Sequence, residues 1–258
     1  YRRAVLSLEV FPASVPRRGS AVNILPVTGA EAMCEAIRAA GIIPFFKGAV
    51  PGFSIEELTP PDHWFYTSDE LGPWDWKIAA VQSGDIVYGK FLDGGKAAFA
   101  TLSWFAHLMN WRRSLPRFKP DASGRKVLEM LESQGTVSSA DIRKLLGIRK
   151  AAADGVSTRL MYQTRLVIGD IRRVYSGPSL VYSGWQRCVF CTPEALFGAD
   201  SGDQARPAEL VFGGFSPFSA KDPLDAGCSP PESRKAILDH LGSLLPEASG
   251  EALDRLLR

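Results

Sequence analysis

The stretch VSSADIRKLLGIRKAAADGVSTRLMYQT, residues 137–164, decides the fold class that the sequence predicts. Ser138 or Ser139 supplies an N-cap, and the apolar residues Ile142 and Leu146 behind it share one helical face. A short turn, GIRK, separates this helix from a second one over RKAAADGVSTRLMYQT. Two helices joined by so short a turn are typical of a helix-turn-helix.

The segments on either side extend this pattern. SGRKVLEMLESQG (123–135) predicts a helix that precedes the pair and ends at Gly135. RLVIGDIRRVYSG (165–177) and SLVYSGWQRCVF (179–190) are rich in β-branched and aromatic residues and meet at a Gly-Pro turn. Three helices followed by a hairpin are the order of a winged helix-turn-helix. We therefore predict a winged-helix domain over residues 121–198.

The segment before it, residues 27–120, predicts an α+β region. Thr28 and Ser103 are expected to cap two of its helices, and Asp93-Gly94-Gly95 is strong turn chemistry for a β-hairpin. The expected elements are a helix over 28–41, a helix that begins at Pro73 and runs to about Ser83, the hairpin over 85–102, and a helix over 103–113.

The two ends of the chain are expected to be simpler. Residues 1–26 are basic and contain Pro and Ser, which predicts a loose arm. Residues 199–258 predict a loop followed by two amphipathic helices in PPESRKAILDHLGSLLPEASGEALDRLLR, packed on the body. The predicted fold class is thus α+β: a winged helix, an N-terminal helix and β-hairpin region, and C-terminal helices.

Composition narrows the class of protein. The chain has 258 residues, 45% hydrophobic and 22% charged, which is ordinary globular composition. No run of 18 apolar residues is present, so we expect no membrane span, and we expect no signal peptide. Cys188 and Cys191 form a CxxC that lacks a second ligand pair, so plain buried thiols are expected rather than zinc. We predict a reduced, cytoplasmic protein without metal or cofactor.

Charge is uneven along the chain and indicates a polyanionic partner. The net charge is +2, yet residues 101–175 carry 14 Lys and Arg against 6 Asp and Glu. Such a basic centre favours double-stranded DNA as the partner, through salt-dependent phosphate contacts. The alternative is that these cations are merely solvated on an interaction module. The predicted nucleic-acid-binding residues are Arg112, Arg113, Arg117, Lys119, Arg149, Lys150, Arg159, Arg165, Arg172 and Arg173.

The linker NWRRSLPRFK, residues 110–119, allows two interpretations. Trp111 and Phe118 alternate with arginines, which suits a groove where rings stack bases and guanidinium groups hold phosphates. Equally, the two rings pack the halves of the protein together while the arginines face water.

LGPWDWKIAAVQSGD, residues 71–85, places a carboxylate between two indoles. In a helix from Pro73, Trp74 aligns with Ile78 in a stripe that faces the core. Trp76 lies about 200° around the helix from Trp74, so it is expected to face outward and to meet either another layer of protein or a base. Asp75 falls in the first turn, where a carboxylate stabilises the helix dipole.

Three segments together resemble the bacterial AlkZ-related family. They are GPWDWK, GDIVYGKFLDGGKAAFATLSWFAHLMNWRRSLPRF and GDIRRVYSGPSLVYSGWQRCVFCTPEALFG, and the resemblance spans about residues 27–198. It implies distant kinship to AlkZ-type DNA glycosylases, which are built of winged-helix units and excise alkylated bases. What the resemblance implies here is winged-helix architecture and DNA binding in DNA repair.

The catalytic motif of those glycosylases, Gln-x-Asp or Gln-x-Gln, is absent from this chain. None of the five glutamines fits it, and Gln82 with Asp85 is one residue too long. No catalytic residue carries over by position. We therefore nominate Asp75 as the carboxylate that a glycosylase needs beside a flipped base, in a pocket of Trp74 and Trp76. The alternatives are a non-catalytic winged-helix regulator or protein-interaction module, and an enzyme that acts on a small molecule near the same indoles.

Overall fold

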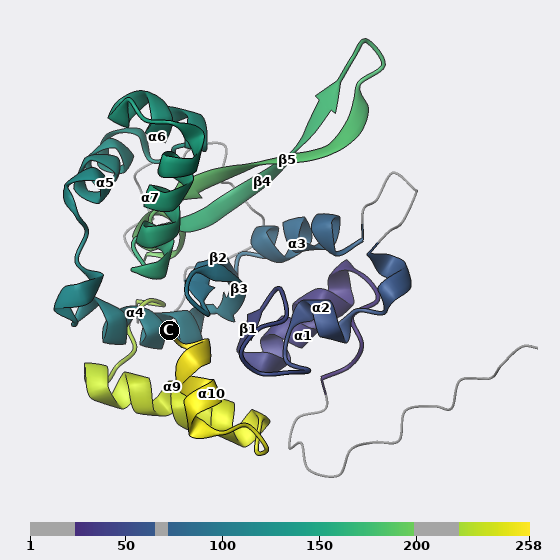
Figure 1. The fold of residues 1–258 in the computed structure, drawn as a ribbon, viewed down its shortest axis with the longest axis vertical. Coiled ribbons are helices and arrows are strands. Elements are labelled where there is room, and N and C mark those ends of the chain that lie inside the picture. Colours follow the sequence, from purple (N-terminus) through teal and green to yellow (C-terminus); the bar gives the residue numbers. More distant parts are fainter. Residues whose placement is uncertain (1–23, 65–71, 199–221) are drawn as a thin grey trace, which may run out of the picture.

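The computed structural model describes residues 24–64, 72–198 and 222–258. These residues form an α+β fold with ten α-helices and two small antiparallel sheets (Figure 1). The predicted basic arm falls outside the described residues up to residue 23, as does the predicted loop between residues 199 and 221. Within the described part, no helix is both long and apolar enough to cross a bilayer.

The first sheet has the order β1-β3-β2 and contains the predicted hairpin. Strands β2 (Ile86–Leu92) and β3 (Lys96–Thr101) pair antiparallel around the predicted turn, where Asp93 has a φ of 44°. Strand β1 (Ile42–Pro44) was not predicted. It pairs with β3 in the register Ile42↔Ala100, and its three residues are all buried. A short, wholly apolar run does not alternate, so its strand character is not visible in the sequence.

Helices α1 (Ala30–Ala40), α3 (Pro73–Gln82) and α4 (Leu102–Arg113) lie where they were expected, but two predicted caps are wrong. Gly29, not Thr28, is the N-cap of α1, with no side-chain cap bond. Helix α4 begins directly from the end of β3, so Thr101 is its N-cap and Ser103 lies inside the helix. Because β3 runs directly into α4, the N-cap lies two residues earlier than predicted.

The predicted order of three helices and a hairpin is confirmed. Asp121 caps α5, Ser138 and Asp141 form a capping box on α6, and Gly147 ends α6 in the left-handed conformation. A backbone bridge joins Val137, between α5 and α6, to Phe190 of the hairpin. The elements are α5 (Ala122–Gln134), α6 (Ser139–Leu146), α7 (Lys150–Tyr162), β4 (Val167–Ser176) and β5 (Val181–Cys191).

The C-terminal helices pack on the body as predicted. Helix α9 (Pro230–Leu244) lies along α4, and α10 (Gly250–Leu256) follows it (Figure 1). The backbone N–H of Asp93 donates to Leu256 O at 2.8 Å, so the chain end is tied to the β2–β3 turn. Shorter helical segments are α2 (Ile55–Leu58), η1 (Pro61–His63), η2 (Pro116–Phe118) and α8 (Pro193–Phe197).

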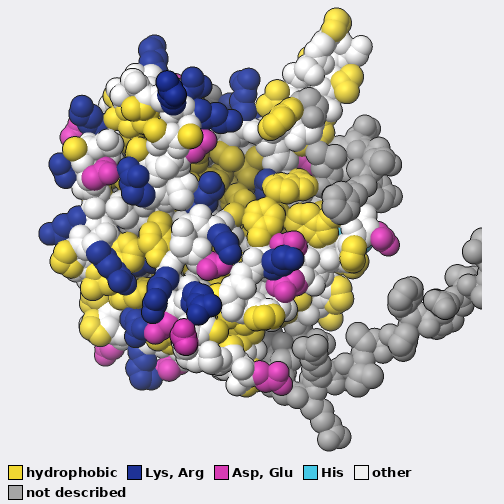
Figure 2. All heavy atoms as spheres, viewed as in Figure 1, with side chains coloured by type: hydrophobic (Ala, Val, Ile, Leu, Met, Phe, Trp, Pro, Cys, Tyr) yellow, Lys and Arg dark blue, Asp and Glu magenta, His cyan; other side chains and the backbone are white. Residues whose placement is uncertain are grey.

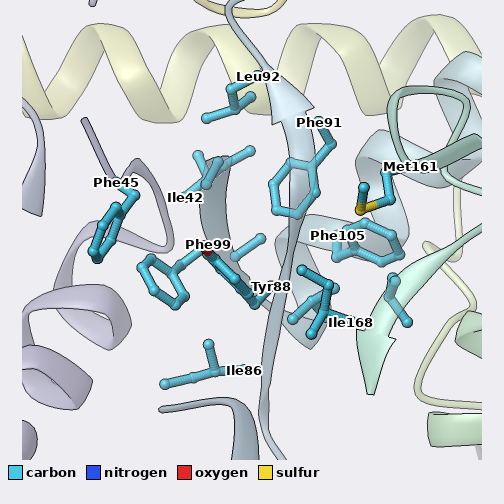
Figure 3. Close-up of a cluster of buried hydrophobic side chains, with 14 of the residues drawn as sticks. Ile42, Phe45, Ile86, Tyr88, Phe91, Leu92, Phe99, Phe105, Met161 and Ile168 are labelled. Atoms are coloured by element: carbon cyan, nitrogen blue, oxygen red, sulfur yellow. The ribbon is translucent and has the colours of Figure 1, made fainter. Parts of the chain in front are cut away.

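One hydrophobic core passes through both predicted domains. Tyr88 of β2 stacks on Phe99 of β3, with ring centroids 4.6 Å apart. Met161 of α7 and Ile168 of β4, which follow the predicted domain boundary at residue 120 in the sequence, pack into the same cluster (Figure 3). Residue 120 lies in coil between η2 and α5, yet the side chains on its two sides share one core.

Candidate nucleic-acid interface

The two strands β4 and β5 form a ribbon whose outer part projects from the body (Figure 1). Four apolar side chains on this outer part are exposed: Tyr175 (52%), Leu180 (71%), Val181 (62%) and Trp185 (73%). We call these four residues the ribbon tip. Exposed large apolar side chains gathered at one place are a mark of a contact surface.

The ribbon is tied to α3 through the carboxylate of Asp75. Oδ1 accepts hydrogen bonds from Arg173 Nε at 3.0 Å, Tyr182 OH at 3.0 Å and Gln186 Nε2 at 3.1 Å. Gln186 also donates to Trp74 O at 2.8 Å. We call Asp75, Arg173, Tyr182 and Gln186 the tether. It joins Asp75, in the first turn of α3, to Tyr182 and Gln186, which follow it in the sequence by 107 and 111 residues.

The two charged groups of the tether, Asp75 and Arg173, pair with each other. Partial burial lowers the pKa of Arg173, but the Asp75 charge and hydrogen bond outweigh it, so the net pKa is raised. The Asp75 side chain has no exposed surface, whereas that of Arg173 is 35% exposed. The predicted catalytic role of Asp75 would require the carboxylate to meet a sugar or a water, and in this conformation its surface is covered by protein.

The predicted orientation of Trp74 is wrong. Trp74, expected in the core, is 39% exposed, whereas Trp76 is only 6% exposed, which confirms the alternative that another layer of protein covers it. Helix α3 lies between α1 and the base of the ribbon, so it has buried residues on more than one side. Trp76 packs against the ring of His63, with centroids 5.3 Å apart. The two indoles therefore do not line one pocket.

Trp74 instead belongs to a cluster of aromatic rings that reaches from the core to the surface. Its ring centroid lies 5.7 Å from that of Phe45, 5.6 Å from that of Phe46 and 6.0 Å from that of Trp64. The amine of Lys77 lies 4.7 Å from the Trp74 ring, and burial lowers its pKa. A cation over an indole face at this distance stabilises both groups.

Arg112, predicted to bind nucleic acid, is a buried structural residue, so that prediction is wrong. Its side chain is wholly buried and donates to Tyr162 O at 2.8 Å and to Leu257 O at 2.7 Å. The guanidinium lies 4.4 Å from the centroid of the Tyr162 ring, and burial lowers the pKa of Arg112 to about 10. It connects α4, α7 and the C-terminal segment, so no phosphate can reach it.

The rest of the linker divides between packing and surface. Trp111 and Phe118 are buried, which confirms the packing alternative for these rings. Arg113 is mostly enclosed and donates to Glu194 and to Thr164 O. Of the four cations of the linker, Arg117 and Lys119 are exposed.

The remaining predicted cations lie on or beside the three helices and the ribbon. Arg149 is the N-cap of α7 and Lys150 its first residue, and both are exposed. Arg159 pairs with Asp121 at 3.1 Å and Arg172 with Asp170 at 3.1 Å. Lys and Arg side chains are scattered over this part of the surface (Figure 2).

Arg165 is half-buried, and its pKa is lowered by burial and by Arg113. The CxxC cysteines are also enclosed: burial raises the pKa of Cys188 and raises that of Cys191 to about 12. Among the described residues no group of His, Cys, Asp and Glu could hold a metal ion.

Sequence reasoning missed Tyr182 and Gln186. Both lie in a hairpin that it identified, but neither has a local pattern that points to a carboxylate so distant along the chain. The available signal is a Tyr and a Gln four residues apart in one strand. That pattern is too common in strands to identify a binding partner.

A comparison of the sequence with known proteins finds one family. The model of the family described as AlkZ related matches residues 27–210, more than half of the chain. The match covers the first sheet, the tether, the three helices and the ribbon. No curated protein and no solved structure matches the sequence.

Proposed function

We propose that this chain, which belongs to the AlkZ-related family, binds double-stranded DNA through α5, α6, α7 and the β4–β5 ribbon. The observation that carries the proposal is the ribbon itself. It projects from the body with an exposed apolar tip, and it stands beside a helical unit with exposed cations at the start of α7.

We further propose that residues 121–198 act as a winged helix. The order of three helices and a hairpin supports this, as does the bridge between Val137 and Phe190, which adds a short third partner to the ribbon. In such a unit α7 enters the major groove with its N-terminal residues, and the ribbon lies along the adjacent backbone or groove.

The start of α7 has the electrostatics of an anion site. Arg149 and Lys150 are cations at a helix N-terminus, where the helix dipole opposes positive charge by about 0.3–1 kcal/mol each. A DNA phosphate placed there relieves that repulsion and also accepts from free backbone N–H groups. The neighbouring Ala151 and Ala152 are small and exposed, so they let the backbone come close to the groove.

The charge of this surface can be tested with a matched pair of double variants. Arg149→Ala/Lys150→Ala removes two exposed cations from α7, and Lys235→Ala/Arg255→Ala removes two exposed cations from α9 and α10. Fluorescence anisotropy on a duplex at several salt concentrations measures affinity and the salt slope. We expect the α7 variant to bind about tenfold more weakly and with a salt slope reduced by about 2. Equal losses in the two variants would show that binding is only a net-charge effect and would overturn the proposed interface.

The tether favours a binding function in which Asp75 has a positioning role. Family kinship to DNA glycosylases supports a test for base excision, but the Asp75 carboxylate is covered by Arg173, Tyr182 and Gln186. Release of alkylated bases from a duplex, compared between wild type and Asp75→Asn, separates the two roles. Binding without release in either protein supports the non-catalytic module. Release by wild type that is lost in Asp75→Asn, with binding retained, would establish a glycosylase and refute the positioning role.

The four cysteines are free thiols, which supports the proposed cytoplasmic location.

A further inference from the structure

A cysteine, a histidine and a serine meet where the start of α9 packs on α4. Cys228 Sγ lies 3.7 Å from Nδ1 of His107 and 3.3 Å from Oγ of Ser233. The same Nδ1 lies 3.1 Å from the Ser233 hydroxyl. Each of the three side chains thus contacts the other two.

The exposure of the three groups suits a reactive thiol on a fixed support. Cys228 is exposed, His107 is half-buried and Ser233 is fully buried. Asn110 Nδ2 donates to Ser233 Oγ at 2.9 Å and to Cys228 O at 2.8 Å. Asn110 therefore holds both the backbone of the cysteine and the hydroxyl that faces its sulfur.

The other three cysteines provide a comparison within the same chain. Cys34 and Cys191 are buried and Cys188 is half-buried. Burial is the largest cause that raises the pKa of each. These thiols are enclosed by the core, whereas Cys228 is exposed and has a base beside it.

We propose that Cys228 is a reactive thiol that undergoes thiol–disulfide exchange with a small organic disulfide, with His107 as proton acceptor and Ser233 as hydrogen-bond donor to the thiolate. This inference does not depend on DNA binding.

The step balances without any other reactant. The Cys228 thiol gives its proton to Nδ1 of His107, and the Ser233 O–H turns toward the sulfur. The thiolate attacks one sulfur of the disulfide, a new S–S bond to Cys228 forms, and the old S–S bond breaks. The leaving thiolate takes the proton from His107 and departs as a thiol. Cys228 is oxidised to a mixed disulfide, and one sulfur of the small disulfide is reduced.

Acyl transfer, the other common chemistry of a cysteine and histidine pair, is less well served. It requires N–H donors for an oxyanion. Pro230 and Pro231 at the start of α9 have no N–H. The N–H of Ser233 donates to Ser229 O, and the N–H and hydroxyl of Ser229 both donate to the Glu232 carboxylate. Exchange at sulfur needs no such donors.

A cavity of about 340 Å³ adjoins the cluster and limits the kind of disulfide. Asn110 lines it, so the same side chain contacts both the cavity and the cluster, and Pro230 forms part of its wall. Asp225 places a carboxylate on its lining, and Arg113, whose guanidinium already donates to Glu194 and to Thr164 O, forms part of the wall. A ligand that carries an ammonium, such as an amino-acid or small-peptide disulfide, complements that carboxylate.

The test measures mixed-disulfide formation with glutathione disulfide by mass spectrometry and peptide mapping. We expect Cys228 to react at least about tenfold faster in the folded protein than in the urea-unfolded chain, because only the folded state supplies the base. His107→Gln should remove most of this acceleration and Ser233→Ala part of it. His63→Gln, a histidine remote from the cluster, is the matched control and should react like wild type.

Two results would overturn the proposal: a Cys228 that reacts no faster when folded than unfolded, or a folded His107→Gln variant that reacts like wild type. Circular dichroism and urea titration check that each variant folds. If His107→Gln does not fold, the comparison of folded with unfolded wild type and the rate of Ser233→Ala decide in its place.

Discussion

The inner and outer halves of the β4–β5 ribbon are built of similar residues but have opposite surroundings. On the inner half, Val167, Ile171 and Phe190 are buried in the core shared with the first sheet. On the outer half, Leu180 and Trp185 are among the most exposed apolar side chains described. The strands are continuous, so the difference is made by what packs against them.

The tether lies at the change from one half to the other. Arg173 and Gln186, which pair across the two strands, meet Asp75 of α3 beside the inner half, and Tyr182 reaches the same carboxylate from farther out, opposite Tyr175. The comparison teaches that apolar residues in a strand stabilise the fold only where another element covers them. Beyond that point the same residue types remain available for a partner. The predictions below test this division, beginning with the largest expected effect.

Phe190→Ala on the inner half should cost about 3–5 kcal/mol of unfolding free energy, since it leaves a cavity in the core. Urea denaturation monitored by fluorescence measures the loss. Tyr175→Ala, an aromatic truncation on the outer half that starts from 52% exposure, is the matched control and should change stability little. Equal losses would mean that the two halves are not distinct.

Arg112→Met should cost about 2–4 kcal/mol, because two buried carbonyls, Tyr162 O and Leu257 O, lose their donor while the volume is nearly kept. Arg117→Met is its control: Arg117 also lies over the Phe118 ring, at 4.9 Å, but is exposed. Thermal and urea unfolding of both variants tests whether the buried arginine has the structural role assigned to it. A loss for Arg112→Met no greater than for Arg117→Met would contradict it.

Asp75→Asn should cost about 1 kcal/mol, because the partner Arg173 is partly exposed and solvent screens the lost charge. Its distinctive effect is local. Hydrogen exchange at the backbone of residues 173–186 should become faster, while exchange in the inner half stays unchanged. Asp85→Asn breaks another arginine–carboxylate pair, Arg38–Asp85 at 2.7 Å, and should leave ribbon exchange as in wild type. Unchanged exchange in Asp75→Asn would show that the tether does not hold the ribbon.

Trp185→Ala should change stability by no more than about 0.5 kcal/mol, since its ring is 73% exposed. If the ribbon tip contacts DNA, the same change should weaken duplex binding by about tenfold, because the apolar surface of the indole would no longer be buried against the groove. Anisotropy titration measures this, with Trp74→Ala, an exposed indole on α3, as control. A stable variant with wild-type affinity would remove the tip from the interface.

Local chemistry predicted most of the secondary structure. The Asp93-Gly94-Gly95 turn, Gly41, Gly135 and the Ser138 cap each act within a few residues, so their effect can be read without the rest of the chain. The caps at Thr28 and Ser103 failed because neighbouring elements decided where those helices begin. The same applies to β1, which is a strand because β3 lies beside it.

The candidate site was less predictable than the elements that carry it. Arg112 and Arg117 appeared equivalent in the linker, but only one has buried carbonyls facing its guanidinium. Trp74 was expected in the core but is half exposed, and protein rather than a base covers Trp76, because helix α3 is covered on two sides. In the cluster of Cys228, His107 and Ser233, His107 is separated along the sequence from the other two by 121 and 126 residues. No local pattern can predict contacts over such a separation.

The sequence by itself determined the order of the longer helices and of the two hairpins, the basic centre and the family, because propensity, caps and charge are properties of short segments. Only the tertiary structure decided which cations reach solvent, which indole is buried and that Asp75 serves as a tether. Those outcomes depend on which surfaces meet, and burial is a property of a pair of surfaces rather than of either one. In LGPWDWK, residues 71–77, the sequence predicts the start of a helix. The contact with the β4–β5 ribbon decides the role of the Asp75 carboxylate.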